Sequence, residues 1–377
     1  MISVQDVRLK ALQVLRPIDP FLLLVTICII GIATLMMGSA SPERMDAHLI
    51  NVGVGITVMW VMACQPPQRL HSFALPLYVC GVLLLVAVEL FGDISKGAQR
   101  WLNLGFIRIQ PSELMKIAMP LMLAWYFQKH EGSLKVRDFL VATVLLALPV
   151  ALILKQPDLG TSLLVLGAGV FVIFFAGLSW KLIVPAVLLG SAAITAIILF
   201  ESQICAHDVK WPGLHDYQKH RVCMMLDPSS DPLGKGFHTI QSSIAVGSGG
   251  VFGKGYRAGT QTHLDFLPER HTDFILAVIS EEFGLAGVLI IILLYCLLIG
   301  RGLMIAMNAA TLFGRLLAGS VTMIFFTYAF VNMGMVAGIL PVVGVPLPMV
   351  SYGGTALVTL MLGIGILMSV QQHRRRR

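Results

Sequence analysis

Ten long apolar segments constrain the fold of this chain more than any other feature. Each approaches the roughly 20 residues that a helix needs to cross the hydrocarbon core of a bilayer. Hydrophobic residues make up 56% of the 377 positions and charged residues only 12%, whereas soluble proteins carry roughly 25% charged residues. No water-soluble core absorbs this much apolar surface, so we expect a membrane protein. The segments lie at about 20–38, 48–64, 72–91, 113–128, 139–155, 160–177, 181–200, 272–300, 312–336 and 351–371.

The predicted fold is an all-α integral membrane protein with about ten transmembrane helices in a single domain over residues 1–377. Residues 201–271, between the seventh and eighth spans, form a large extracytoplasmic loop with short helices on the membrane surface. The short loops and termini on one side of the spans carry fourteen Lys and Arg residues, and those on the other side carry five. Because positively charged loops stay in the cytoplasm, we expect both termini to be cytoplasmic and the 92–112 loop to lie outside.

The most densely ionisable stretch runs from Asp265 to Asp273, where the long loop meets the eighth apolar segment. It includes Glu269 and Arg270. With a helix predicted to begin near residues 271–272, Asp273 falls in its first turn at the outer membrane surface. One interpretation is an acid favoured by the helix dipole and by the exposed N–H groups of that turn. The other is a general base at the mouth of a cavity.

Further acids lie at or below the predicted membrane surface. Glu281 and Glu282 follow about two helical turns after Asp273, roughly 12 Å deeper. Acids at that depth are costly unless they face a polar interior, so at least one is expected to point inward and meet a cation. Glu113 and Lys116 are three residues apart in the fourth span and share a helix face, so they can pair. This pair either only fixes helix packing or lines the same cavity as Asp273.

Three other outer boundaries offer groups for binding. Residues 155–162 supply a cation, an acid and a hydroxyl, with Lys155 and Asp158 among them. Arg100 and Trp101 either anchor the 92–112 loop at the interface or hold a sugar ring and a phosphate by stacking and charge. Residues 338–355, which include Ser351, are apolar but rich in Pro and Gly. Because irregular backbone persists at membrane depth only where it is buried or lines a cavity, we predict a re-entrant wall there. An ordinary apolar outer loop is the alternative.

The glycine-rich stretch from Gly247 to Gly255 does not match a phosphate-binding P-loop. Ser248 stands where the first glycine is required, and Gly255 follows Lys254 in place of Ser or Thr. A flexible turn is favoured over a cradle for pyrophosphate.

Neither a metal site nor a disulfide follows from the sequence alone. No pair of histidines has the helical spacing and intervening acid that would indicate zinc. Carboxylates with a pyrophosphate would suit Mg²⁺ or Mn²⁺ better, so the metal ligands stay unassigned. Cys205 and Cys223 lie in the long loop, where an oxidising compartment would permit a disulfide. Two free thiols are the alternative.

Taken together, these motifs resemble the SEDS family, the RodA and FtsW proteins of bacterial cell-wall synthesis. They run from about residue 95 to residue 355, and the ten spans extend the likeness over the whole chain. The short N-terminus and the Glu-Arg-His-Thr-Asp wording are closer to the RodA branch than to the FtsW branch. The segments that carry the resemblance are 100–101, 110–116, 156–162, 232–234, 241–242, 247–250, 266–274, 281–284 and 348–354.

The resemblance implies a peptidoglycan glycosyltransferase of the bacterial inner (cytoplasmic) membrane that polymerises lipid II during cell elongation and shape maintenance. The donor would be the growing glycan on undecaprenyl pyrophosphate, and the acceptor would be the 4-OH of GlcNAc in an incoming lipid II. The family's essential acid matches Asp273. The implied partners are a class B penicillin-binding protein, which is a transpeptidase, and other elongation-complex proteins; no nucleic acid is expected.

On this basis Asp273 is the predicted catalytic base. Basic groups near the outer surface, or a divalent cation, would offset the charge on the departing pyrophosphate. The alternative function is a lipid II flippase, because buried acids and broken helices also suit a transporter; a third is an inactive scaffold for a transpeptidase. The predicted substrate-binding residues are Arg100, Trp101, Glu113, Lys116, Lys155, Asp158, Arg221, Glu269, Arg270 and Ser351.

Overall fold

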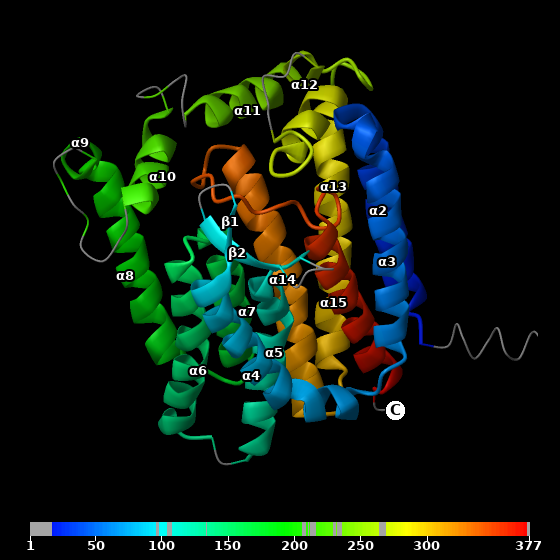
Figure 1. Ribbon diagram of the computed structural model, residues 1–377, viewed down its shortest axis with the longest axis vertical. Coiled ribbons are helices and arrows are strands. Elements are labelled where there is room, and N and C mark those ends of the chain that lie inside the picture. The colour runs from blue at the N-terminus through cyan, green and yellow to red at the C-terminus, as the bar shows by residue number, and fades with distance from the viewer. Residues whose placement is uncertain are drawn as a thin grey trace, which may run out of the picture.

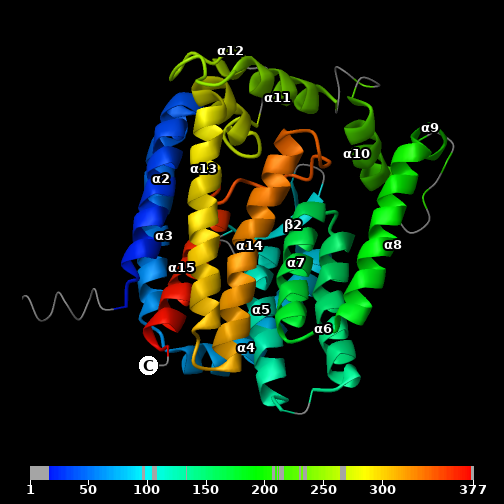
Figure 2. The ribbon, with the colours of Figure 1, turned by 180° about the vertical axis from the view of Figure 1, so that it is seen from behind.

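A bundle of long helices makes up most of the chain in the computed structural model (Figures 1 and 2). The structure describes residues 17–95, 98–103, 108–132, 134–205, 209, 211, 216–228, 231, 236–263 and 269–374. Each of the ten predicted spans contains a long helix, which confirms the multi-pass membrane fold. These helices are α2 (Pro20–Ala40), α3 (Met45–Ala63), α4 (Pro67–Phe91), α5 (Pro111–Lys129), α6 (Val136–Lys155), α7 (Leu159–Phe175), α8 (Trp180–Leu199), α13 (Ile275–Met307), α14 (Leu312–Val336) and α15 (Gly354–Gln372).

Capping side chains and prolines fix where several of these helices begin. Asp19 accepts a hydrogen bond from the Leu22 N–H at 2.9 Å and starts α2, and Thr311 caps α14 through the Gly314 N–H. Proline occupies the first helical position of α2, α4 and α5, where its missing N–H costs nothing. The boundaries are therefore set locally, before the helices pack.

Helix α14 lies in the centre of the bundle and α8 at its edge. Most residues of α14 are buried, and it packs against α13, α7 and α5. Its Ser320 is fully buried and donates to the Ala168 carbonyl of α7 at 2.7 Å. Helix α8 has no buried residue and stands beside the bundle in both views (Figures 1 and 2).

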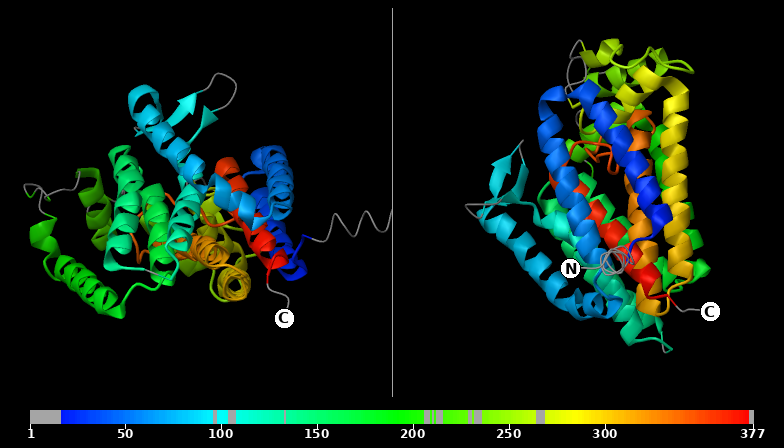
Figure 3. Two further views of the ribbon diagram at one scale, coloured as in Figure 1. Left: turned by 90° about the horizontal axis from the view of Figure 1, so that it is seen from below. Right: turned by 90° about the vertical axis from the view of Figure 1, so that its right-hand side faces the viewer.

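Both ends of the described chain lie at one end of the bundle. Arg301 in α13 pairs with Asp19 before α2 at 2.5 Å, and Ser369 near the end of α15 donates to the Gln65 carbonyl between α3 and α4. The loop helices α11 and α12 lie at the opposite end (Figures 1 and 3). The shared side of the termini agrees with the predicted topology, and its assignment to the cytoplasm stays a prediction.

The 92–112 loop forms a small antiparallel sheet that the sequence did not predict. Its strands are β1 (Asp93–Ser95), β2 (Ala98–Asn103) and β3 (Arg108–Ile109), in the order β1-β2-β3. Arg100 and Trp101 lie on β2, between the ends of α4 and α5, which places both residues on an ordered element.

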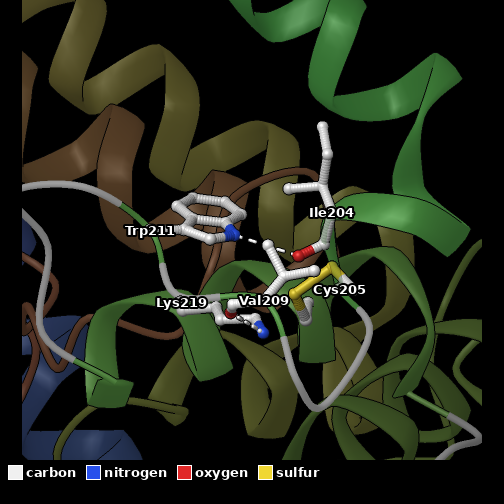
Figure 4. The surroundings of a disulfide bond; sticks show 6 residues. Ile204, Cys205, Val209, Trp211 and Lys219 are labelled. Atoms are coloured by element: carbon white, nitrogen blue, oxygen red, sulfur yellow. Dashed lines mark hydrogen bonds between the residues drawn. A yellow bond between two sulfur atoms is a disulfide. The ribbon is translucent and has the colours of Figure 1, made fainter.

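The described residues of the long loop contain four short helices, and their predicted position on the membrane surface stays a prediction. They are α9 (Glu201–Ile204), α10 (Asp216–Leu226), α11 (Phe237–Ser248) and α12 (Thr260–His263). Of the two alternatives for the loop cysteines, the structure has the disulfide, with the Cα atoms of Cys205 and Cys223 5.8 Å apart. Figure 4 shows this bond beside the Trp211 indole, which donates to the Ile204 carbonyl at 3.0 Å. The disulfide joins the end of α9 to α10, and α11 packs on α13 and α14.

The glycine-rich stretch after α11 is a fixed turn that breaks α13, and not a flexible one. Gly284 has φ 64° inside α13. At that kink the N–H groups of Lys254 and Gly255 donate to the carbonyls of Glu281 and Glu282 at 3.0 Å each. A Cβ on Gly253 would lie 2.1 Å from the Glu282 carbonyl oxygen, so only glycine permits this approach. Because these two N–H groups are bonded within the protein, they do not form a phosphate cradle.

Candidate active site

Asp273 lies in a turn just before α13, not in its first helical turn. The prediction of a helix start near residues 271–272 was wrong, because residues 269–274 close a turn on Glu269. The carbonyl of Glu269 accepts from the N–H groups of Thr272 and Phe274 at 3.1 and 3.3 Å. Its carboxylate accepts from the Thr272 hydroxyl at 2.9 Å. Phe274 then takes the N-cap position of α13, which leaves half-buried Asp273 one residue outside the helix.

The irregular segment between α14 and α15 forms one wall beside this turn. Val345, Leu347, Met349 and Val350 are at most 1% exposed, whereas Ile339 is 71% exposed. The second half of the segment is therefore buried as a re-entrant wall requires, and the first half is not. The Ser351 hydroxyl donates to the Thr272 carbonyl at 2.5 Å and accepts from the Leu347 N–H at 2.7 Å. Ser351 therefore positions the turn. Its predicted contact with substrate stays a prediction.

Asn332 of α14 joins the turn before α13 to the segment between α14 and α15. It is fully buried, and its Nδ2 donates to the Asp273 carbonyl at 2.8 Å and to the Val345 carbonyl at 2.7 Å. Next to Val345, a Cβ on Gly344 would lie 3.3 Å from the Asp273 Oδ2. Our reading of the sequence missed Asn332, although an amide in an apolar span is a signal in itself, since polar residues are rare there and have a role.

A second group of predicted residues meets where α7 begins. Asp158 caps α7 by accepting from the Thr161 N–H at 3.1 Å, and it also accepts from the Gln110 side chain at 3.1 Å. Arg100 donates to the Pro157 carbonyl at 2.6 Å, and its Nε lies 3.8 Å from the Asp158 carboxylate. The polar side chains at this point therefore come from β2, from the residue before α5 and from α7.

The predicted pair of Glu113 and Lys116 is present. Lys116 is 3% exposed and donates to the Glu113 carboxylate at 2.6 Å. It also donates to the hydroxyl of Tyr328 in α14, a partner that the sequence reading missed because it lies 212 positions away. Gln110, one position before α5, bonds to Asp158, and α5 packs against α7, so the buried ion pair lies near the Asp158 group.

The segment 343–345 separates that neighbourhood from Asp273. A Cβ on Gly160, two residues after Asp158, would lie 2.8 Å from the Val343 carbonyl oxygen. The same segment also approaches the Asp273 carboxylate, because a Cβ on Gly344 would lie 3.3 Å from its Oδ2. The start of α7 and the acid before α13 therefore lie close together across a single strand of backbone.

Residues 16–376 match the family model of the FtsW, RodA and SpoVE cell cycle proteins. The chain belongs to this family, the SEDS proteins. A peptidoglycan glycosyltransferase named MrdB from Escherichia coli (strain K12) is 51% identical over 361 residues, covering 95% of this chain and 94% of the relative. The RodA peptidoglycan glycosyltransferase of Treponema pallidum is 32% identical over 424 residues, covering 94% and 98%.

Two solved structures share the fold of this SEDS protein. Rod shape determining protein RodA of Thermus thermophilus superposes with a TM-score of 0.69 at 27% identity, covering 95% of this chain and 98% of that one. A chain from a structure described as "Structural coordination of polymerization and crosslinking by a peptidoglycan synthase complex" has a TM-score of 0.77 at 32% identity, covering 95% and 99%. The similarity therefore extends over nearly the whole chain in sequence and in structure.

Other residues predicted to bind substrate have protein partners of their own in this SEDS protein. Arg270 donates to the carbonyls of Ala40 and Thr262 at 2.8 and 2.7 Å, which ties α2 to α12. Lys155 is 68% exposed and pairs with Glu89.

Trp101 and Arg221 were also predicted to bind substrate. The Arg108 guanidinium lies 5.4 Å from the centre of the Trp101 ring. Helix α10, which carries Arg221, lies beside α8 at the edge of the molecule (Figures 1 and 2). Substrate contacts by these residues, and by Glu269, stay predictions.

Glu281 and Glu282 bond to segments around α12, at the end of the bundle opposite the termini, and do not lie deep in the bundle as predicted. Glu281 is fully buried and accepts from the Lys254 ammonium at 2.7 Å and from the N–H groups of Thr260 and Gln261 at 2.8 and 3.1 Å. It thus meets the expected cation. Glu282 accepts from the Ser39 hydroxyl of α2. Both acids therefore join α13 to neighbouring segments.

His271 is the titratable neighbour of Asp273 in the turn. Burial lowers the pKa of the His271 imidazole, and the nearby Arg44 guanidinium lowers it further. The imidazole ring lies edge-on to the Tyr352 ring, with centroids 5.9 Å apart. A neutral imidazole at neutral pH therefore packs against the Tyr352 ring.

An apolar groove of about 600 Å³ opens beside the start of α13. Leu276 and Ser280 of α13, Gly334 of α14 and Gly247 of α11 contribute to its lining, and most of its other lining residues are apolar. Such a lining suits a hydrocarbon chain. Within the part of the chain that the structure describes, no three His, Cys, Asp or Glu side chains gather as ligands for a metal ion.

Proposed function

We propose that this SEDS protein is a peptidoglycan glycosyltransferase that polymerises lipid II into glycan strands during cell elongation. The observation that carries the proposal is the 51% identity, over 95% of the chain, to a relative named as such an enzyme. The chain is a multi-pass membrane protein, and we place it in the bacterial inner membrane with both termini in the cytoplasm. Asp273 then faces the side where lipid-linked glycan is assembled.

In this proposal Asp273 is the general base of an inverting displacement. Its carboxylate takes the proton of the acceptor 4-OH as that oxygen attacks the anomeric carbon of the donor sugar. The bond from the anomeric carbon to the pyrophosphate breaks with inversion, and undecaprenyl pyrophosphate leaves with the electron pair. The position of Asp273 between two anchored segments supports this role, because a base must be held within hydrogen-bond reach of the hydroxyl it activates.

The lipid tail and the pyrophosphate have separate surroundings in this scheme. The apolar groove beside α13 and α14 suits the polyprenyl tail, and Arg100, close to the start of α7, is the basic side chain we assign to the pyrophosphate. The described residues do not gather a ligand set for a resident metal ion, so we assign no step to one. Mg²⁺ or Mn²⁺ enters the proposal only as a counterion carried by the substrate pyrophosphate.

The proposed partner is a class B penicillin-binding protein that supplies cross-linking within an elongation complex. The similarity to a chain of a peptidoglycan synthase complex, described as coordinating polymerisation and crosslinking, supports it. Addition of the purified transpeptidase is expected to raise the rate of polymerisation by the SEDS protein.

The test is polymerisation of purified lipid II in detergent, followed as glycan chains on a gel. The wild-type protein is expected to form chains with no membrane gradient, whereas a flippase forms none. Asp273→Asn is expected to lower the rate by about 10²–10⁴-fold, the usual contribution of a general base. Asp46→Asn, an exposed acid in the first turn of α3, is the matched control and keeps the rate. An Asp273→Asn protein as active as the wild type would show that Asp273 is not the general base. A rate unaffected by EDTA would show that no divalent counterion is needed.

A further inference from the structure

The carboxylate of Asp273 is held in place by a support that lies behind it. The support consists of Asn332 on α14 and the backbone of residues 343–345. We propose that Asn332 and Gly344 are positioning residues that set where the Asp273 carboxylate stands relative to the acceptor hydroxyl. This inference rests on the proposed function of Asp273 and adds two residues to it.

Asn332 bonds to the backbone of two segments, the turn before α13 and the segment between α14 and α15. Its Nδ2 has two protons, and they go to the carbonyls of Asp273 and Val345 at 2.8 and 2.7 Å. The side chain is fully buried, and within the described residues its Oδ1 has no hydrogen-bond partner. A buried oxygen without a partner is costly, so an apolar side chain would serve packing alone better. The two donated bonds are therefore the function that this amide performs.

Gly344 sets the near limit of the carboxylate. A Cβ there would lie 3.3 Å from the Asp273 Oδ2, a contact tight enough to displace the carboxylate by a few tenths of an ångström. Gly344 has φ 74°, a conformation that glycine adopts at no steric cost. Its hydrogen therefore leaves room that any other side chain would take from the base.

The start of α7 fixes the other side of this support. A Cβ on Gly160 would lie 2.8 Å from the Val343 carbonyl oxygen and 3.6 Å from the Gly344 carbonyl oxygen. Asp158 caps the same helix and interacts with Arg100. The backbone that supports Asp273 thus packs on α7, and the N-cap residue of α7 interacts with Arg100, the side chain assigned to the pyrophosphate. Residues 343–345 therefore set the spacing between the general base and the side chain assigned to the leaving pyrophosphate.

Two pairs of variants separate positioning from stability. Gly344→Ala and Gly338→Ala introduce the same side chain at φ 74° and 72°, but the nearest atoms to a Cβ at Gly338 are 4.0 Å away. Asn332→Ala and Ser320→Ala each remove a fully buried side chain of α14 that donates to a backbone carbonyl. Both members of each pair are expected to lose stability, and within each pair only the first member lies next to Asp273.

The measurement is the kcat and KM of lipid II polymerisation by purified full-length variants, corrected for the folded fraction by size-exclusion chromatography. Because a misplacement of about 1 Å can cost roughly 10²-fold, we expect kcat to fall about three- to tenfold for Gly344→Ala and about ten- to a hundredfold for Asn332→Ala, with KM unchanged. Gly338→Ala and Ser320→Ala are expected to keep kcat. In an Asp273→Asn background, Gly344→Ala is expected to add nothing.

The inference is overturned if each first member matches its control, or if KM rises while kcat stays constant. If Asn332→Ala does not fold, the glycine pair alone decides the question. The Asp273→Asn variant in the same assay keeps the two proposals apart. A large loss there, with Gly344→Ala equal to Gly338→Ala, rejects the positioning residues and leaves the general base in place.

Discussion

The buried pair of Glu113 and Lys116 offers a quantitative test of how this bundle tolerates charge. Lys116 is 3% exposed, the Glu113 side chain is 13% exposed, and their charged atoms are 2.6 Å apart. Lys116→Met removes the cation and leaves Glu113 nearly enclosed. Breaking one side of a buried ion pair costs about 3–5 kcal/mol. The remaining exposure of Glu113 places the expected loss near the lower end, about 3 kcal/mol.

Replacing both members should restore most of that loss. Exchange of a buried ion pair for neutral residues of similar volume is often neutral or stabilising. The double variant Glu113→Gln/Lys116→Met is therefore expected to lie within about 1 kcal/mol of the wild type, the net worth of the lost Tyr328 hydrogen bond. Replacement of Glu113 in the Lys116→Met protein is therefore expected to recover about 2–3 kcal/mol of stability.

The free energy of unfolding would be measured by titrating SDS into detergent micelles and following helical circular dichroism. A loss of unfolding free energy below about 1 kcal/mol for Lys116→Met would refute the reasoning, because a buried carboxylate without its cation is expected to cost more than that. So would a double variant as unstable as the single one. Polymerisation by the double variant then tests the predicted substrate contact: restored stability with a lost rate would show that the pair binds substrate.

Two further predictions follow from other contacts. Burial lowers the pKa of His271 in the folded protein, so below its ordinary value of 6.5 the unfolded chain binds the proton first. Stability is expected to fall from pH 6.5 down to the lowered pKa and to level off there, and thermal unfolding of His271→Gln should show a flatter decline. Gly253→Ala would place a Cβ 2.1 Å from the Glu282 carbonyl oxygen, whereas at Gly250, also with positive φ, it meets nothing within 4 Å. Gly253→Ala is therefore expected to cost about 1–3 kcal/mol more than Gly250→Ala, and equal thermal unfolding of the two would contradict the wedge at the kink.

Features that depend on neighbouring residues were predictable from the sequence. The ten spans follow from their length and apolar content, because a bilayer accepts few other structures. The pair of Glu113 and Lys116 follows from helical spacing alone. The start of α13 was placed too early because the turn that closes on Glu269 competes with the helix.

Features that depend on distant segments were not predictable in the same way. Tyr328 meets Lys116 from another helix, and the bonds of Lys254 and Gly255 to the kink of α13 join separate segments. The glycine-rich sequence alone does not distinguish a flexible turn from one that is hydrogen-bonded to the kink of a helix. The disulfide was open for the same reason, since pairing depends on where α9 and α10 come to lie.

The structure holds the backbone of Asp273 and the carboxylate of Glu281. Glu281 is held through its carboxylate, which accepts from Lys254 and from two backbone N–H groups. Hydrogen bonds of this kind stabilise the charged form of a carboxylate, which suits a group that keeps one protonation state. Asp273 is anchored through its backbone carbonyl by Asn332. This backbone bond does not depend on the proton that the carboxylate carries, so it is the same before and after Asp273 takes the proton from the sugar.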